Sequence, residues 1–231
     1  MSAHSSDGEA ARLAGFIDHT ILKPDARQDE VATFCDEARR FGFRSVCVNP
    51  VQVAFVAARL AGSDVRTCSV VGFPFGATTP EAKAAETAGA VADGADEIDM
   101  VIDIGALKDG RLDAVRADIA AVRAASAGVL LKVIIENAML TDEEKRAACR
   151  LAKDGGADFV KTSTGYGGGG ATVEDVALMR REVGPEIGVK AAGGVRTREA
   201  AEAMIAAGAT RIGTSSGLAI IGQSKPVAGS Y

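Results

Sequence analysis

Three lysines lie inside short apolar segments of this sequence, where a charged side chain is costly to bury. The segments are LLKVIIE with Lys132, FVKTSTG with Lys161 and GVKAAGG with Lys190. An isolated lysine of this kind commonly extends its ammonium group to solvent. Three in successive segments favour a chemical role, because a desolvated lysine near another cation is a good amine nucleophile toward carbonyl compounds.

Lys161 and Lys190 are expected to lie at similar depth on consecutive strands. Two ammonium groups close together raise the cost of charging both, so the pKa of one of the two should fall. A neutral amine of this kind is what a Schiff-base enzyme requires. The residues alone do not decide which lysine is the nucleophile. The glycine-rich loop after Lys161 favours Lys161, because such a loop can admit and enclose a substrate; a merely loose loop is the alternative.

An acidic partner for the lysines is present in DEIDMVID, residues 96–103. Side chains on a strand alternate between its two faces. One register turns Glu97, Asp99 and Asp103 inward, and the opposite register turns the apolar residues between them inward. We favour the first register because it directs the apolar residues toward covering helices. Asp99 then forms either a structural ion pair with the lysines or a proton relay to a reacting carbon or hydroxyl.

Two segments of small residues, AAGGVRT and GTSSG, end the last two predicted strands. Both offer backbone N–H groups just before a helix, where barrels often bind phosphate. Either segment alone is weak evidence, since glycine also simply ends strands, but together they predict a phosphate site. Its candidate residues are Gly193, Gly194, Val195, Arg196, Ser215 and Ser216.

Short β-prone segments alternate with longer Ala-rich segments along the whole chain. The predicted strands are 15–20, 44–49, 66–73, 96–105, 129–136, 158–164, 188–194 and 210–217. The predicted helices are 29–41, 50–61, 79–94, 111–126, 141–156, 172–183 and 197–208. Three of these helices begin with a hydroxyl followed by acidic residues, which is typical of a helix start, at Thr141, Thr172 and Thr197.

Eight strands alternating with helices predict parallel βα units, and eight such units fit a (β/α)8 TIM barrel. A doubly wound open sheet is the alternative, but it usually carries a glycine-rich phosphate loop after the first strand, and this sequence has none there. We therefore expect a single barrel domain over 9–222, a disordered extension over 1–8 and a flexible tail over 223–231. Active sites of barrels lie at the carboxyl ends of the strands, where this sequence places polar residues such as Asp18 and Glu136.

The net charge of −5 and the lack of a basic block argue against nucleic acid as a partner. No uncharged apolar run is long enough to span a membrane, and the short polar N-terminus is unlike a signal peptide. The four cysteines form no C-x-x-C pair and there are only two histidines, so neither a zinc site nor a disulfide framework is expected. These features predict a cytoplasmic protein with reduced, buried thiols.

With these residues in place, the sequence resembles the deoxyribose-phosphate aldolases, a class I aldolase family, from about Phe16 to Ser216. The resemblance rests on eight motifs in the same order: DHTILKP, CVNP, VVGFPFG, ADEIDMVIDIG, LKVIIE, DFVKTSTGYG, VKAAGGVRT and GTSSG. It implies a barrel-shaped lyase that reversibly cleaves 2-deoxy-D-ribose 5-phosphate to D-glyceraldehyde 3-phosphate and acetaldehyde. The implied context is the catabolism of deoxyribose phosphate and deoxyribonucleotides, and the implied assembly is a homodimer or a larger homo-oligomer.

The resemblance also implies roles for single residues. Lys161 would form the Schiff base, and Asp99 and Lys190 would relay protons. Thr162 and the two small-residue segments would bind the substrate and its phosphate. The iminium would act as the electron sink, so neither a metal nor an organic cofactor is implied.

Both tyrosines of the chain lie at positions that are informative in comparison with the family. Some members end with a mobile tyrosine that assists proton transfer, and Tyr231 matches it; a disordered chain end is the alternative. Some members carry a lysine soon after KTSTG that assists phosphate binding, whereas this chain has Tyr166.

Three other interpretations share some of these features. Another Schiff-base aldolase acting on a different sugar phosphate would use the same lysines and phosphate segments. A metal-dependent barrel isomerase would need histidine and carboxylate ligands that two histidines barely provide. A non-catalytic barrel that binds a sugar phosphate would not explain three strand lysines beside Asp99.

Overall fold

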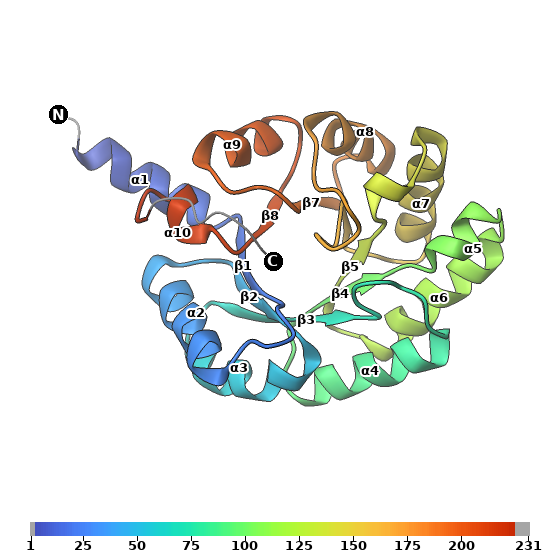
Figure 1. Cartoon of the computed structure of the whole chain (residues 1–231), viewed down its shortest axis with the longest axis horizontal. Coiled ribbons are helices and arrows are strands. Elements are labelled where there is room, and N and C mark those ends of the chain that lie inside the picture. Colours follow the sequence, from blue (N-terminus) through green and yellow to red (C-terminus); the bar gives the residue numbers. More distant parts are fainter. Residues whose placement is uncertain (1–2, 225–231) are drawn as a thin grey trace.

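Eight parallel strands close into a barrel in the order of the chain, with β8 paired to β1 (Figure 1). The computed structural model describes residues 3–224, and side chains from Gly8 onward. The strands are β1 (Ile17–Ile21), β2 (Ser45–Val48), β3 (Arg66–Val71), β4 (Glu97–Val101), β5 (Leu130–Ile134), β6 (Phe159–Lys161), β7 (Gly188–Ala192) and β8 (Arg211–Thr214). The predicted (β/α)8 TIM barrel is confirmed.

Helices surround the barrel on its outside (Figure 1). The predicted helices are present as α2 (Gln28–Phe41), α3 (Val53–Leu60), α4 (Pro80–Ala92), α6 (Leu112–Ala125), α7 (Asp142–Asp154), α8 (Val173–Val183) and α9 (Arg198–Ala206). The hydroxyls of Thr141, Thr172 and Thr197 each accept a hydrogen bond from a backbone N–H of the first helical turn, as expected. Short elements complete the ring: the helices α5 (Ile104–Lys108) and α10 (Gly217–Ile220), and the 3₁₀ turns η1 (Pro50–Gln52) and η2 (Asn137–Met139).

Two segments differ from the prediction. The helix α1 (Ala3–Ala14) includes most of the segment 1–8, for which we expected disorder. Its C-terminal end is fixed because Leu13 and Ala14 pack into the core. The segment 96–105 is not one strand: β4 ends at Val101, and the Asp103 side chain accepts from Ala106 N at 2.9 Å and caps α5. Asp103 therefore serves as a helix cap and is not part of the inward-facing set.

The strands separate two different environments. Their outward side chains, such as Ile98 and Met100, pack with the helices into one large apolar core. A smaller apolar cluster of Leu22, Cys47, Cys68 and Val70, with Phe73 packed against it, is separate from that core. Charged side chains are also buried inside the barrel, which is unusual for a barrel interior and points to function. They are Asp18, Glu97, Asp99, Lys132, Lys161, Lys190 and Arg211.

A buried ion pair between two helices fixes the carboxyl end of β4. Lys83 on α4 contacts Asp118 on α6 at 2.6 Å, and both side chains are buried. The Lys83 ammonium also donates to Val101 O at 2.8 Å, and Asp118 accepts from Asp103 N at 3.1 Å. The pair thus holds the strand that carries Asp99 from outside the barrel.

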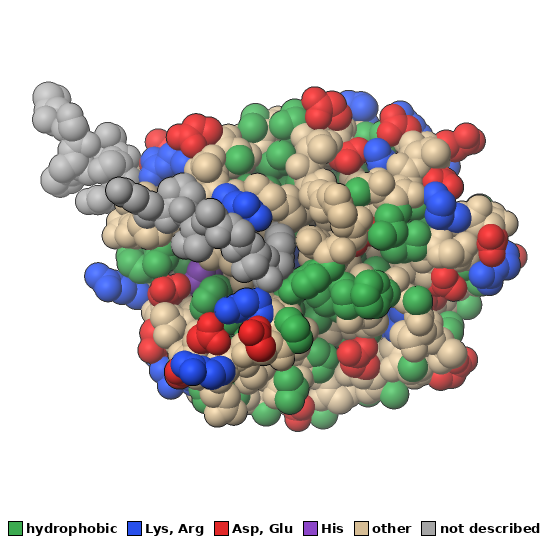
Figure 2. Space-filling model, in the orientation of Figure 1, with side chains coloured by type: hydrophobic (Ala, Val, Ile, Leu, Met, Phe, Trp, Pro, Cys, Tyr) green, Lys and Arg blue, Asp and Glu red, His purple; other side chains and the backbone are tan. Residues whose placement is uncertain are grey.

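No helix within residues 3–224 is long and apolar enough to cross a membrane. On the face shown in Figure 2, charged side chains are spread around the rim and apolar side chains gather near the middle.

Candidate active site

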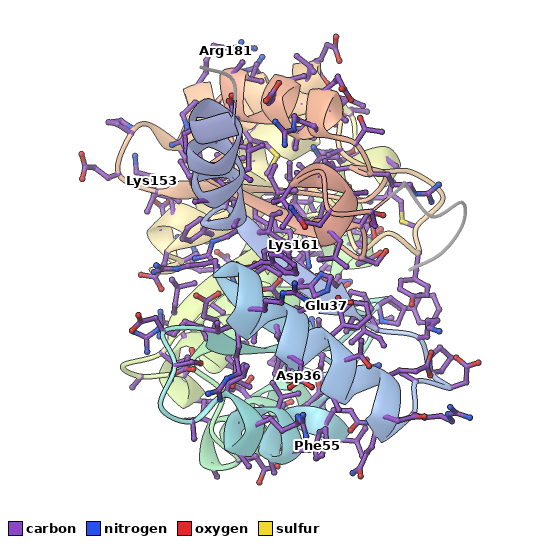
Figure 3. The ribbon with its side chains drawn as sticks, turned by 90° about the vertical axis from the view of Figure 1, so that its left-hand side faces the viewer. Asp36, Glu37, Phe55, Lys153, Lys161 and Arg181 are labelled. Carbon is purple, nitrogen blue, oxygen red and sulfur yellow. The ribbon has the colours of Figure 1, made fainter. Side chains whose placement is uncertain are left out.

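The Asp99 carboxylate is the meeting point of the three strand lysines. Strand register pairs Asp99 with Lys132 and Lys161 with Lys190. Asp99 Oδ2 lies 2.9 Å from Lys161 Nζ and 2.8 Å from Lys190 Nζ. Its other oxygen, Oδ1, lies 2.7 Å from Lys132 Nζ. The structure therefore brings the three predicted catalytic residues together, and the expected inward direction of Glu97 and Asp99 is confirmed; Figure 3 shows Lys161 near the middle of the molecule.

A second layer of charge lies next to these residues inside the barrel. Arg211 on β8 contacts Asp18 at 2.6 Å and Glu97 at 2.9 Å. Asp18 in turn contacts Lys190 at 2.5 Å, and Glu97 contacts Lys132 at 2.6 Å. Sequence reasoning assigned no role to Arg211, although it is a further charged residue inside a short apolar segment, the same signal that identified the lysines.

These contacts fix the protonation of most of the cluster. Burial lowers the pKa of Lys132 and of Lys190, but nearby carboxylates, chiefly Asp99 for Lys132 and Asp18 and Asp99 for Lys190, outweigh it and raise both pKa values. Burial likewise raises the pKa of Asp99, but its three lysine neighbours outweigh this and hold the pKa well below its usual range. The expected fall in pKa therefore does not occur at Lys190.

Lys161 has the fewest carboxylate contacts of the four basic groups in the buried cluster. The buried cluster has four basic groups and three carboxylates, so one basic group can lose its proton without leaving a carboxylate unpaired. Among the described ion pairs, Lys161 contacts only the carboxylate of Asp99, whereas Lys190 contacts two carboxylates. Lys161 is also close to the mouth of the barrel, with 3% of its surface exposed.

Aromatic side chains cover the approach to Lys161. Its Nζ lies 6.0 Å from the centroid of the Phe73 ring, and Tyr166 packs edge-on against that ring at 5.6 Å. The Tyr166 hydroxyl donates to Leu22 O at 3.1 Å. Phe73 belongs to the VVGFPFG motif, but nothing in the sequence indicated that it would meet Tyr166.

Two thiols lie beside Asp99. The donor atoms of Cys47, Cys68 and Asp99 are within 4.8 Å of one another, a spacing that metal ions also use. However, Cys68 Sγ donates to Asp99 at 3.3 Å and accepts from Lys132 Nζ at 3.4 Å. Because ammonium groups surround these donors, a bound cation would be repelled, and the set fits hydrogen-bonded thiols better than a metal site.

The predicted phosphate segments lie at the ends of the adjacent strands β7 and β8. Gly193 and Gly194 adopt left-handed conformations, with φ of 90° and 80°. The loop after β6 packs on them, since Ala171 N donates to Gly193 O at 2.9 Å. Arg196 is exposed, and Ser215 is partly buried directly after β8.

Three of the predicted binding residues have other contacts. The Val195 side chain packs into the outer core, so only its backbone is available. The Ser216 N–H donates to Thr214 Oγ1 at 2.9 Å. The Thr162 hydroxyl donates to Ala192 O at 3.0 Å and accepts from Ala192 N at 3.1 Å, so this side chain joins β6 to β7. Tyr231 lies outside the described residues.

Comparisons with known proteins agree with this geometry. The model of the DeoC/LacD family aldolases matches residues 12–223. The deoxyribose-phosphate aldolase of Rhodospirillum rubrum is 64% identical over 214 residues, covering 93% of this chain and 90% of the relative. The deoxyribose-phosphate aldolase of Brevibacillus brevis is 59% identical over 216 residues, covering 94% and 98%. A solved structure, described as a tetrameric deoxyribose phosphate aldolase from Aeropyrum pernix, has a TM-score of 0.87 at 32% identity and covers 96% of this chain and 97% of its own.

Proposed function

Because the chain belongs to the DeoC/LacD family of aldolases, we propose that it reversibly cleaves 2-deoxy-D-ribose 5-phosphate to D-glyceraldehyde 3-phosphate and acetaldehyde. Relatives at 59% and 64% identity carry the name of that activity. The observation that carries the proposal is the shared Asp99 oxygen, with Lys161 at 2.9 Å and Lys190 at 2.8 Å. An amine nucleophile thus lies beside both a carboxylate and an ammonium group, which are the groups that a proton relay needs.

The chemistry follows from these positions. Lys161 Nζ adds to the aldehyde carbon of the open-chain sugar, and loss of water gives the iminium. The C3 hydroxyl then loses its proton toward Asp99, and the C2–C3 bond breaks as its electrons pass into the iminium. This step releases glyceraldehyde 3-phosphate and leaves an enamine on Lys161. Lys190 and Asp99 return a proton to the enamine carbon, and water releases acetaldehyde and the free lysine.

The sugar phosphate is bound by the segments that end β7 and β8. The backbone of Gly193, Gly194 and Val195 supplies N–H groups, and Arg196 adds a positive charge. Ser215 and Ser216 complete the phosphate site from the neighbouring strand end. Thr162 contributes by holding β6 and β7 in register, since its hydroxyl is bonded to Ala192.

The protein acts in the cytoplasm as a homo-oligomer, a dimer or larger, in deoxyribose phosphate catabolism. Its four cysteines are buried and free, as in proteins of a reducing compartment. The relative from Aeropyrum pernix is described as tetrameric, which supports assembly.

Borohydride trapping tests the proposal. The protein is incubated with 2-deoxyribose 5-phosphate or acetaldehyde, reduced with sodium borohydride, and digested for peptide mapping by mass spectrometry. We expect a substrate-dependent adduct on Lys161. An adduct on Lys190 would keep the reaction class and exchange the roles of the lysines. A folded protein without any adduct would favour a non-catalytic binding barrel.

A further inference from the structure

A chain of hydrogen bonds spans the mouth of the barrel between opposite strands. Glu136 lies just after β5, and its carboxylate accepts from the Thr164 hydroxyl and from Thr164 N at 3.3 Å. The same hydroxyl accepts from Tyr166 N at 3.0 Å. The Tyr166 hydroxyl donates to Leu22 O, just after β1, at 3.1 Å. Since β1 and β5 are opposite strands of the eight-stranded barrel, segment 164–167, here called the strap, is held from both sides.

The anchor at Glu136 has an unusual geometry. Its backbone φ is 57°, and it is the non-glycine residue with a left-handed backbone among residues 3–224. Only 1% of Glu136 is exposed. Gly167 lies directly against its side chain, because a Cβ on Gly167 would be 2.6 Å from Glu136 Cδ. A strained conformation of this kind persists only where the surroundings hold it, and such positions concentrate at functional sites.

The strap contributes an aromatic side chain to the surroundings of Lys161. Tyr166, which lies in the strap, packs against Phe73, and the Phe73 ring is 6.0 Å from Lys161 Nζ. The chain that continues from the strap reaches Gly170, which packs on Gly193 of the phosphate segment. One segment therefore touches both ends of the space that a sugar phosphate bound at Lys161 would occupy.

We propose that Glu136 is a positioning residue for the reaction, which holds the strap against a sugar phosphate bound between Lys161 and the phosphate segment. This inference rests on the proposed function, because it takes Lys161 as the nucleophile. Both carboxylate oxygens of Glu136 accept from Thr164, so Glu136 acts through the strap. A short aldehyde that reaches only Lys161 does not need the strap, whereas the sugar phosphate does.

Substitution at each end of the chain of hydrogen bonds tests the proposal. Glu136→Gln weakens a hydrogen bond to a charged acceptor and should raise KM for 2-deoxyribose 5-phosphate about tenfold. Tyr166→Phe removes the hydroxyl that binds Leu22 O and should raise KM by about three- to tenfold. In both variants kcat should stay within about threefold, because Lys161, Asp99 and Lys190 keep their own contacts. Borohydride trapping of acetaldehyde on Lys161 should be as fast as in the unchanged protein, which a general loss of structure would not allow.

A double substitution tests the contact between Glu136 and Gly167. Gly167→Ala alone should raise KM, because its methyl group would collide with the Glu136 carboxyl carbon. In a Glu136→Gly background the three atoms nearest to the added methyl group are absent, so the same alanine should add little to KM. If the effects of the two substitutions on KM simply add in the double variant, the proposed contact between Glu136 and Gly167 is wrong.

Glu143→Gln is the matched control, since Glu143 is an exposed residue at the start of α7. It should leave KM and kcat unchanged. If Lys161 is trapped but Glu136→Gln and Tyr166→Phe behave like this control, the positioning role is wrong and the proposed function stands. If Lys161 is never trapped, the proposed function fails irrespective of the strap. Should Glu136→Gln not fold, Tyr166→Phe decides, and an unchanged KM in that variant overturns the inference.

Discussion

The two carboxylate oxygens of Asp99 contact three lysines. Lys132 contacts Oδ1, and Lys161 and Lys190 contact Oδ2. The Lys161 amino group therefore lies within hydrogen-bond distance of an oxygen that the Lys190 ammonium also contacts. When Lys161 reacts with a substrate, the Asp99 carboxylate therefore stays paired with Lys132 and Lys190.

Lys161→Ala should abolish turnover while the barrel stays folded. The variant lacks the amine that forms the covalent intermediate, so kcat/KM should fall on the order of 10³-fold or more. The measurement is the rate of sugar phosphate cleavage, with circular dichroism to verify folding. Lys153→Ala, which changes an exposed lysine at the edge of the molecule, should retain full activity (Figure 3). Turnover by folded Lys161→Ala would contradict the assigned mechanism.

Removal of Tyr231 tests the predicted role of the last residue. If Tyr231 assists proton transfer at the enamine carbon, truncation should slow exchange of the acetaldehyde methyl protons with solvent more than it weakens substrate binding. Proton exchange is followed by nuclear magnetic resonance in deuterated water. Exchange at the rate of the full-length chain would rule out this role.

Two loops pack closely against each other at the predicted phosphate segment. Gly170, in the loop after β6, approaches Gly193 at the end of β7 so closely that a Cβ would be 2.3 Å from Gly193 O. Ala171 N also donates to that oxygen. The glycine-rich loop therefore packs directly on the predicted phosphate segment 193–196, and Gly170 is needed for this contact.

Gly170→Ala should push these two loops apart. We expect KM for the sugar phosphate to rise, and the free energy of unfolding to fall by about 1–3 kcal/mol from overpacking. Steady-state kinetics and urea unfolding measure the two effects. Gly89→Ala is the control: Gly89 lies inside α4 with nothing within 4 Å of the added methyl group, so stability should rise by about 0.5–1 kcal/mol and KM should not change. If Gly170→Ala and Gly89→Ala change KM and the free energy of unfolding alike, the packing argument is wrong.

The charged interior of the barrel makes the free energy of unfolding depend on pH. The pKa of Asp99 is held well below 3.8, so its stabilisation is fully present above that value and is lost as pH falls toward the depressed pKa. The pKa values of Lys132 and Lys190 are raised above 10.5, so their contribution is present below 10.5 and is lost as pH rises further. The cluster should therefore stabilise the barrel throughout the range between these limits.

Asp99→Asn tests this linkage. The substitution leaves buried lysines without their common partner and should lower the free energy of unfolding by about 3–5 kcal/mol near neutral pH. The difference between the two proteins should shrink as pH falls below 3.8, because the Asp99 carboxylate then loses its own advantage. Urea unfolding at several pH values measures it, with the exposed Asp113→Asn as control. A difference that does not change with pH would show that Asp99 stabilises the barrel by packing and not by charge.

Local patterns in the amino-acid sequence predicted the order of the elements, the barrel and the candidate residues Lys161, Lys190 and Asp99. Alternation of apolar segments and capped helices is a local property, so it could be recognised without any contact between distant residues. The same holds for Lys161, Lys190 and Asp99, because charge inside an apolar strand is visible from its neighbours in the chain. Local signals failed at α1, and at Asp103, where a cap ended a strand that the apolar pattern seemed to prolong.

Contacts between side chains distant in the sequence became visible in the folded barrel alone. Tyr166 bonds to Leu22 O across 144 residues, and Arg211 bonds to Asp18 across 193. The local sequence does not indicate either contact, because these residues meet only when the barrel closes. Pairing of β6 with β7 turned the Thr162 hydroxyl toward Ala192, and packing inside the barrel left Lys161 with fewer carboxylate contacts than Lys190. Composition and periodicity fix which residues face inward, but their partners depend on how eight strands pack around one axis.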